Sequence, residues 1–210
     1  MKRLFFLLII FFLSINLFSQ NLGTKLDGQE KEKFEIAIRK ANKELKSFES
    51  EFIIEKTSSV ISEKSISKGT MFFENPAKLR WETFGNNAYS LIVNNDVVAI
   101  KNASGDIMNN SKMLKNLGNF IINIINGKNL SNNNDFQSEF YQNNDKINLQ
   151  LIPIQKKIKD LYSDIIIEIN KKNFLADKII LNEKSGDCTL IILNEKKIDI
   201  KISDEKFKIN

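Results

Sequence analysis

The side chains able to do chemistry in this sequence are carboxylates, one cysteine and large apolar residues in alternation. The chain contains no histidine, which excludes Ser-His-Asp triads, histidine-containing zinc sites and imidazole acid–base catalysis. Cys188 is the only cysteine and lies in an apolar strand pattern, so we expect a buried structural thiol. No glycine-rich phosphate loop is present, and no carboxylates form a recognisable catalytic pair. We therefore expect a protein that is not an enzyme and that has no cofactor and no metal site.

Binding of an apolar ligand is the chemistry that remains, and residues 69–83 are its strongest signal. A strand is predicted to begin at the glycine of this stretch, to break at its proline and then to resume. Large apolar and polar side chains alternate in both halves, which is the period of a strand with one apolar face. Met71 and Phe73 share a face in the first half, and Leu79 and Trp81 share one in the second. The stretch predicts a hairpin that contributes an apolar surface.

Two amphipathic helices are predicted to cover that surface. The first spans residues 29–45, where Phe34, Ala37, Ile38, Ala41 and Leu45 form one stripe. The second spans residues 113–125, with asparagines on much of its polar side and Gly127 as the expected C-terminal cap. Its apolar residues are Met113, Leu114, Leu117, Phe120, Ile121, Ile124 and Ile125. We expect both helices to lie across one face of a sheet.

Most of the remaining chain reads as short strands separated by turns. The first strand begins at Ser47, with Phe48, Phe52 and Ile54 on one face. Further strands are predicted at residues 89–93, 97–101, 136–141, 146–152, 163–170, 174–182, 189–193 and 197–202. Asparagine-, glycine- and lysine-rich turns connect them without room for crossover helices, which favours consecutive antiparallel hairpins. The fold class is therefore mainly β with covering helices (α+β), with about eleven strands.

The first twenty residues have the features of a signal peptide. Lys2 and Arg3 form a charged start, residues 4–18 are almost entirely apolar, and polar residues follow. An uncleaved N-terminal anchor is the alternative, but the apolar run is shorter than the roughly 20 residues that span a bilayer. We expect residues 1–20 to be a signal peptide, residues 21–210 to be a single domain, and the mature protein to be periplasmic.

The charge balance excludes one class of partner. The full chain has 31 lysines and arginines against 26 aspartates and glutamates, and two of the basic residues lie in the expected signal peptide. Such a mild, interspersed excess does not indicate nucleic-acid binding. We expect a monomer that does not bind nucleic acid.

Several segments, in order, resemble the periplasmic outer-membrane lipoprotein carrier proteins (LolA). The matching segments are SFESEF (47–52), GTMFFENPAKLRW (69–81), SLIVNND (90–96), LQLIP (149–153), IIIEIN (165–170), SGDCTL (185–190) and DEKF (204–207). The resemblance covers essentially the whole mature chain. It implies an incomplete, strongly curved antiparallel β-barrel with a helical lid.

The resemblance also implies a function and a site. The family accepts acylated lipoproteins from an inner-membrane ABC transporter, binds their acyl chains in an apolar cavity and passes them to an outer-membrane acceptor. The implied lipid-binding cavity residues are Phe34, Ile38, Phe48, Phe52, Met71, Phe73, Leu79, Trp81, Leu91, Val93, Leu117 and Ile121. Asn75 occupies the position where studied members carry a basic residue that holds the lid closed, and Arg80 is the nearby basic residue that could replace it.

Other functions are compatible with the same residues. A carrier or sensor for another lipid, such as a pigment or glycolipid precursor, would use the same fold, although a sensor would be expected to carry a second domain. A structural or adhesive β-protein is a further class, and it would have no apolar ligand. In that class the apolar residues form only a core.

Overall fold

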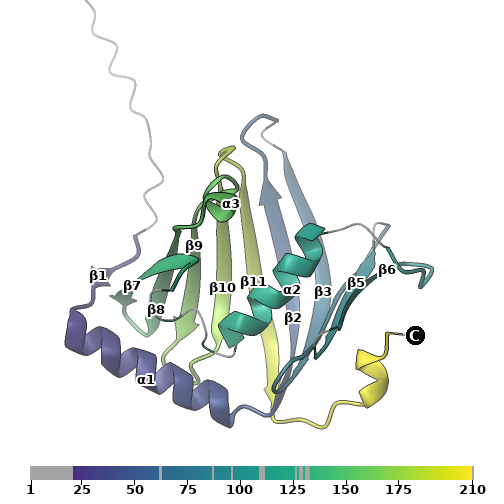
Figure 1. The fold of residues 1–210 in the computed structure, drawn as a ribbon, viewed down its shortest axis with the longest axis horizontal. Helices are drawn as coiled ribbons and strands as arrows, with labels where there is room; N and C mark the ends of the chain where they lie inside the picture. Colours follow the sequence, from purple (N-terminus) through teal and green to yellow (C-terminus); the bar gives the residue numbers. More distant parts are fainter. Residues whose placement is uncertain are drawn as a thin grey trace, which may run out of the picture.

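The computed structural model describes residues 21–61, 63–86, 88–95, 97–108, 112–125, 127, 130 and 133–209, without the side chains of residues 112–117 and 119. The expected signal peptide lies outside the described residues. The described chain forms one strongly curved sheet of eleven strands with helices on its concave side and at one end (Figure 1). Every strand pairing is antiparallel.

The sheet consists of two sets of consecutive hairpins joined in its middle. Its strands are β1 (Thr24–Lys25), β2 (Ser47–Thr57), β3 (Lys64–Glu74), β4 (Lys78–Thr83), β5 (Tyr89–Asn94), β6 (Val97–Asn102), β7 (Phe136–Asn143), β8 (Lys146–Pro153), β9 (Tyr162–Asn170), β10 (Ala176–Glu183) and β11 (Cys188–Ile198). Their order is β1-β7-β8-β9-β10-β11-β2-β3-β4-β5-β6. Strand β11 pairs with β2, and β1 and β6 form the two edges of the described sheet, so the barrel is not closed. This architecture confirms the predicted fold class.

The helices lie where the predicted amphipathic stripes require. Helix α1 (Gly28–Glu44) begins at Asp27, whose side chain accepts a hydrogen bond of 2.9 Å from the Glu30 amide. It lies along one end of strands β7 to β11, whereas α2 (Lys112–Ile125) crosses the concave face and contacts β4, β5 and β6 (Figure 1). Gly127 follows α2 with a positive φ of 67° and donates to the Ile124 carbonyl, as expected of a C-terminal cap.

The concave face carries the hydrophobic core. Register places Met71 opposite Trp81 and Phe73 opposite Leu79, so the predicted hairpin and its apolar face are confirmed. One cluster of buried side chains continues from this hairpin across the sheet. It includes Phe48, Phe52, Leu91, Val93, Ile100, Phe140, Ile147, Leu149, Leu151, Ile165, Ile167, Ile179, Leu181, Ile191 and Leu193. Burial on one face of so many strands accounts for the alternation in the sequence.

Gly69 does not begin a strand, contrary to the prediction, but lies in the middle of β3. A Cβ atom at this position would lie 2.3 Å from Cζ of Phe52 and 2.0 Å from the Glu82 carbonyl oxygen. The missing side chain therefore leaves room for the Phe52 ring to cross the strand. That ring stacks on Trp81 with centroids 3.9 Å apart and an interplanar angle of 22°.

The C-terminal part of the sheet also differs from the prediction. The first of the two strands expected at residues 189–193 and 197–202 and the start of the second form one strand, β11, which ends at Ile198, so residues 199–202 are not strand. The pairing of β11 with β2 is irregular between Asn194 and Lys197. Glu195 has a positive φ of 48° there, so the irregularity is a bulge rather than a turn between strands. Cys188, expected to be buried, is only half-buried at the start of β11, and burial raises the pKa of its thiol.

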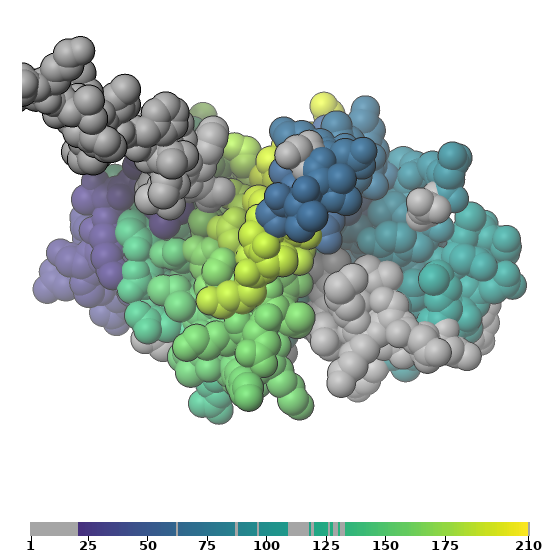
Figure 2. Space-filling view, turned by 90° about the horizontal axis from the view of Figure 1, so that it is seen from above, coloured from purple at the N-terminus to yellow at the C-terminus, as the bar shows by residue number. Residues whose placement is uncertain are grey.

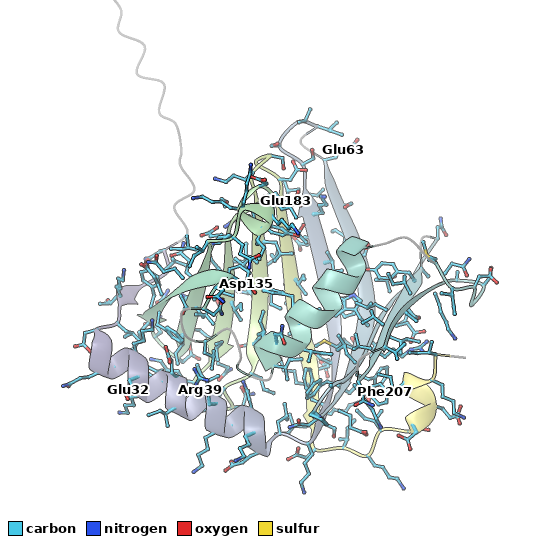
Figure 3. The ribbon with its side chains drawn as sticks, in the orientation of Figure 1. Glu32, Arg39, Glu63, Asp135, Glu183 and Phe207 are labelled. Carbon is cyan, nitrogen blue, oxygen red and sulfur yellow. The ribbon has the colours of Figure 1, made fainter. Side chains whose placement is uncertain are left out.

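Three short elements were not predicted: β1, α3 (Lys156–Lys159) and η1 (Asp204–Phe207). The last of these covers apolar residues on the convex face, beside β4 and β5 (Figure 3). Phe207 is 1% exposed, and Asn94 Nδ2 donates to its carbonyl oxygen at 3.2 Å. Phe72 and Ile92 are buried on the same side of the sheet. The C-terminal segment thus makes a small second core.

The loops at the far end of the sheet from α1 lie side by side. Seen from above, the β2–β3 tip (blue) meets the β10–β11 turn (yellow) (Figure 2). Ser59 joins them, because its amide donates to Asp187 at 2.9 Å and its hydroxyl donates to the Ser185 carbonyl at 2.9 Å. The described residues include no helix long and apolar enough to cross a membrane.

Candidate functional site

An apolar cavity of about 40 Å³ lies between the concave face, the end of α1 and α2. Five of the predicted cavity residues line it: Ile38, Phe48, Met71, Trp81 and Ile121. They come from α1, β2, β3, β4 and α2, so segments far apart in sequence meet at this point. The lining is mostly aliphatic and aromatic, which suits a ligand without charge.

The other predicted cavity residues have different positions. Phe52, Phe73, Leu79, Leu91 and Val93 are buried on the concave face, but they belong to the surrounding core and do not line the cavity. Phe34 is partly buried and packs against the same core. The side chain of Leu117 lies outside the described residues.

Most of the cavity wall was missed by the sequence analysis. The missed residues are Asn42, Ile124, Ile125, Leu130, Leu149, Ile167, Ile169, Phe174, Leu175, Ala176, Ile179, Leu193 and Lys196. Many belong to β8, β9, β10 and β11, whose alternation was recognised as strand structure but not connected to the site. Only the curvature of the sheet brings these strands to face the β2–β4 hairpins.

A charged cluster lies beside the cavity at the β10–β11 side. Lys196, which contributes to the lining, donates from Nζ to Oδ1 of Asp177 at 2.6 Å and to the Leu193 carbonyl at 2.9 Å. Asp177 also pairs with Lys146 and accepts from Asn170 at 3.2 Å. Burial raises the pKa of Asp177, but the hydrogen bonds from Lys146 and Lys196 outweigh it and hold that pKa below its ordinary value. The positive charge of the Lys196 ammonium group is thus neutralised by Asp177 beside the apolar cavity.

The Trp81 indole contributes a further polar atom to the lining, in addition to Lys196 and Asn42. Among the described residues, its Nε1 is the one buried side-chain nitrogen or oxygen without a hydrogen-bond partner. The Tyr89 hydroxyl lies close to this indole. Burial raises the pKa of the Tyr89 phenol, and the interaction with the Trp81 side chain offsets part of that rise. No hydrogen bond of normal geometry joins the two groups.

Asn75 lies in the β3–β4 turn, whereas Arg80 lies in strand β4. Asn75 Nδ2 donates to the carbonyl oxygen of Leu45, the C-cap of α1, at 2.8 Å. The backbone N–H of Asn75 also donates to the Lys46 carbonyl at 2.8 Å. The β3–β4 turn is therefore bound to the end of α1. Arg80 is on the convex face, where its guanidinium binds Glu82 at 2.9 Å and keeps the pKa of that carboxyl below its ordinary value.

The cavity is small and its lining is mostly apolar. Within the described ranges, no group of three or more His, Cys, Asp or Glu side chains could hold a metal ion. The cavity of about 40 Å³ has room for a water molecule but is far smaller than the roughly 300–1,000 Å³ of pockets that enclose a small-molecule ligand. Buried side chains of α1 and α2, among them Ile38, Ile121 and Ile124, occupy space beside the cavity, so a larger apolar ligand would have to displace some of them.

Comparison with known proteins gives the chain a family. The model of "Outer membrane lipoprotein carrier protein LolA" matches residues 43–210, which run from the end of α1 through η1. No curated protein sequence gives a significant match.

Solved structures share the fold at low sequence identity. The structure of MucB is similar with a TM-score of 0.52 and 10% identity over 86% of this chain, and this chain spans 62% of MucB. An uncharacterised conserved protein from Thermus thermophilus gives a TM-score of 0.51 and 8% identity, covering 84% of this chain and 91% of its own. At such identities the likeness concerns the fold alone. With the family model matched from α1 to the C-terminal segment and the open, curved sheet in place, the chain belongs to the outer membrane lipoprotein carrier protein LolA family.

Proposed function

We propose that this protein is a periplasmic chaperone that binds the acyl chains of lipoproteins on its concave face and carries them from the inner to the outer membrane. Membership of the LolA family supports this function. The observation that carries it is the cavity beneath α2, where side chains from both halves of the sheet form one apolar lining.

The small size of the cavity fits a carrier that must also release its cargo. Burial of an acyl chain is favourable by about 0.8 kcal/mol per CH₂, so complete burial in a preformed pocket would make release very slow. Here the concave space is already occupied by Ile121, Ile124 and other protein side chains. Displacing them costs packing free energy, which offsets part of the gain and keeps binding reversible.

The remaining parts of the proposal concern how the protein is exported, loaded with cargo and unloaded. Residues 1–20 would direct export, and residues 21–210 would form the carrier domain. An inner-membrane ABC transporter would load it, and an outer-membrane acceptor would unload it. A holding role for Asn75, through its bond to the end of α1, is part of the same proposal.

A release assay tests the function. Purified protein from Asn21 onward is added to spheroplasts of the native organism, and the supernatant is analysed for acylated lipoproteins. We expect them in a soluble one-to-one complex with the protein. If none is released but organic extracts of the purified protein contain another lipid, the protein is a carrier or sensor for that lipid. Absence of any bound lipid would contradict both functions.

A matched pair of variants links the result to the cavity. Ala176 lines the cavity, whereas Ile180, on the same strand, is half-buried on the convex face. We expect Ala176→Phe to fill the cavity and lower lipoprotein release by about tenfold or more, because overpacking of this kind costs about 1–3 kcal/mol. Ile180→Phe should release lipoproteins like the unchanged protein. Equal release by the two variants would show that the cavity is not the binding site.

A further inference from the structure

Exposed apolar side chains gather on loops at the end of the sheet far from α1. The β2–β3 tip carries Val60, which is 88% exposed, and Ile61, which is 65% exposed. Ile154 and Leu161, on either side of α3, are 53% and 58% exposed. Single exposed apolar residues are ordinary on a protein surface, but several on neighbouring loops indicate an interaction site. We call the three loops that meet here the apex: residues 58–61, 154–161 and 184–187.

Hydrogen bonds hold the loops of the apex against one another. The Lys184 amide donates to the Leu161 carbonyl at 2.9 Å, which joins the β10–β11 turn to the segment after α3. Oδ1 of Asp187 accepts from the amide and the hydroxyl of Ser59 at 2.9 and 3.0 Å, which joins the same turn to the β2–β3 tip. Figure 2 shows the tip (blue), the turn (yellow) and the chain around α3 (green) side by side. The apex is therefore one continuous surface.

Lysines surround the apolar side chains of the apex. Four of them are exposed: Lys156, Lys157, Lys159 and Lys184. Ile158 packs against the core, so α3 is fixed to the body of the protein. The aspartates of the apex are Asp160, which is exposed, and Asp187, whose carboxylate is bound to Ser59. Four lysines against two aspartates give this surface a net positive charge.

We propose that the apex docks on the surface of a lipid bilayer that contains anionic phospholipids. Exposed apolar side chains on protruding loops can enter the boundary between headgroups and acyl chains, while the lysines beside them reach the lipid phosphates. The β2–β3 tip extends beyond the β10–β11 turn (Figure 1). Such an uneven surface fits a fluid bilayer better than the closely packed core of a protein–protein interface.

The contact goes beyond the proposed carrier function, which needs only protein partners for loading and unloading. It would orient the molecule with the apex toward the bilayer and α1 away from it. Docking does not require cargo, so its test is separate from the release assay. Lipoprotein release without vesicle binding would contradict docking alone, and vesicle binding without release would contradict the carrier function alone.

The test is binding of vesicles by the purified protein from Asn21 onward, the first residue that the structure describes. Cosedimentation is measured with vesicles of equal parts phosphatidylglycerol and phosphatidylcholine, and with vesicles of phosphatidylcholine alone. We expect the anionic vesicles to bind about tenfold or more tightly than the neutral ones. High salt should reduce this difference, because it screens exposed charges.

A matched pair of double variants tests the lysines. Lys156→Gln with Lys157→Gln removes two charges from the apex, whereas Lys40→Gln with Lys43→Gln removes two from exposed positions on α1. A lysine close to an anionic bilayer contributes about fivefold to binding. We therefore expect the apex variant to bind anionic vesicles about tenfold or more weakly, and the α1 variant to bind like the unchanged protein.

A second set of variants tests the apolar side chains without changing the charge. Ile61→Ser and Leu161→Ser should each weaken vesicle binding by about 3- to 10-fold, because less apolar surface leaves water. Ile36→Ser is the control, since Ile36 is similarly exposed but lies on α1. Hydrogen exchange of the unchanged protein should also slow on vesicles in residues 58–61 and 154–161, and not in α1.

Four results would overturn the inference. The first is failure to bind anionic vesicles, and the second is equal binding to neutral and anionic vesicles. An equal loss in the apex and α1 lysine variants would show that only the overall charge matters. A dimer in the absence of vesicles that Ile61→Ser and Leu161→Ser abolish would assign the apex to contact with a second copy of the chain.

Discussion

Asp177 is the residue whose ionisation matters most beside the cavity, because it receives hydrogen bonds from Lys146 and Lys196 together. Its pKa is lower in the folded protein than the ordinary value of about 3.9. A lowered carboxyl pKa contributes stability that is present above the unfolded-state value and is lost as pH falls through the folded-state value. The cluster should therefore stabilise the protein at neutral pH and lose that effect below about pH 4.

We expect Asp177→Asn to lower the free energy of unfolding at neutral pH, because Lys146 and Lys196 lose the carboxylate that they share. The loss should shrink as the pH falls below about 4. Urea unfolding at several pH values measures it. Asp160→Asn, at an exposed aspartate after α3, is the control and should have little effect. A constant difference across the pH range would show that the charge of Asp177 is not the cause.

Gly69 is the second residue with a specific prediction. A methyl group there would meet Phe52 and the Glu82 carbonyl at 2.3 and 2.0 Å, so Gly69→Ala should cost about 1–3 kcal/mol and alter the emission of Trp81. Gly28→Ala is the matched control, since nothing lies within 4 Å of a Cβ at Gly28. Chemical unfolding measures both. Equal stability of the two variants would mean that the ring does not lie over the strand as described.

At the scale of elements, α2 depends on a close approach to the sheet at Gly118. A Cβ atom there would lie 3.0 Å from Cδ2 of Leu91 and 3.1 Å from Cγ2 of Val93. We expect Gly118→Leu to move α2 away from β5 and expose the concave face. Binding of an apolar fluorescent dye should rise, and the free energy of unfolding should fall by about 1–3 kcal/mol. Unchanged dye binding would contradict the role of α2 as the cover.

The elements also show what the sequence could predict. Alternation of period two located strands β2 to β11, and the two apolar stripes located α1 and α2. Gly69 and the bulge at Glu195 misled the prediction, because glycine and a run of polar residues normally indicate strand ends. Both depend on tertiary contacts, the Phe52 ring and the pairing of β11 with β2, that no local pattern contains.

The lining of the cavity was predictable only in part, because it too depends on tertiary structure. The residues of the β3–β4 hairpin were found because apolar alternation and the family resemblance coincided there. Ile167, Ile179 and Leu193 carry the same alternation, but their place in the cavity depends on how far the sheet curves. Asn75 and Arg80, which sequence could not distinguish, are separated because Asn75 lies in the β3–β4 turn against the end of α1, whereas Arg80 lies on the convex face of β4.

At the scale of the whole molecule, the cover should be less stable than the sheet. Strands β11, β2 and β3 lie in the middle of the described sheet with partners on both sides, whereas α2 rests on one face. We expect hydrogen exchange measured by mass spectrometry to be faster in α2 than in these strands. A bound acyl ligand should change exchange chiefly in α1 and α2. Uniform exchange throughout the molecule would indicate that the cover does not open separately.

The pairing of β2 with β11 has a further consequence, for the order in which the protein folds. Each set of hairpins can form from neighbouring segments, but Phe52 pairs with Leu193, which lies far along the chain. Closing so long a loop is slow, since its entropy must be lost before the contacts form. Until that pairing forms, the unpaired sides of β2 and then of the β7–β10 hairpins stay open to other chains. The step that completes the sheet is therefore also the step that ends its exposure to aggregation.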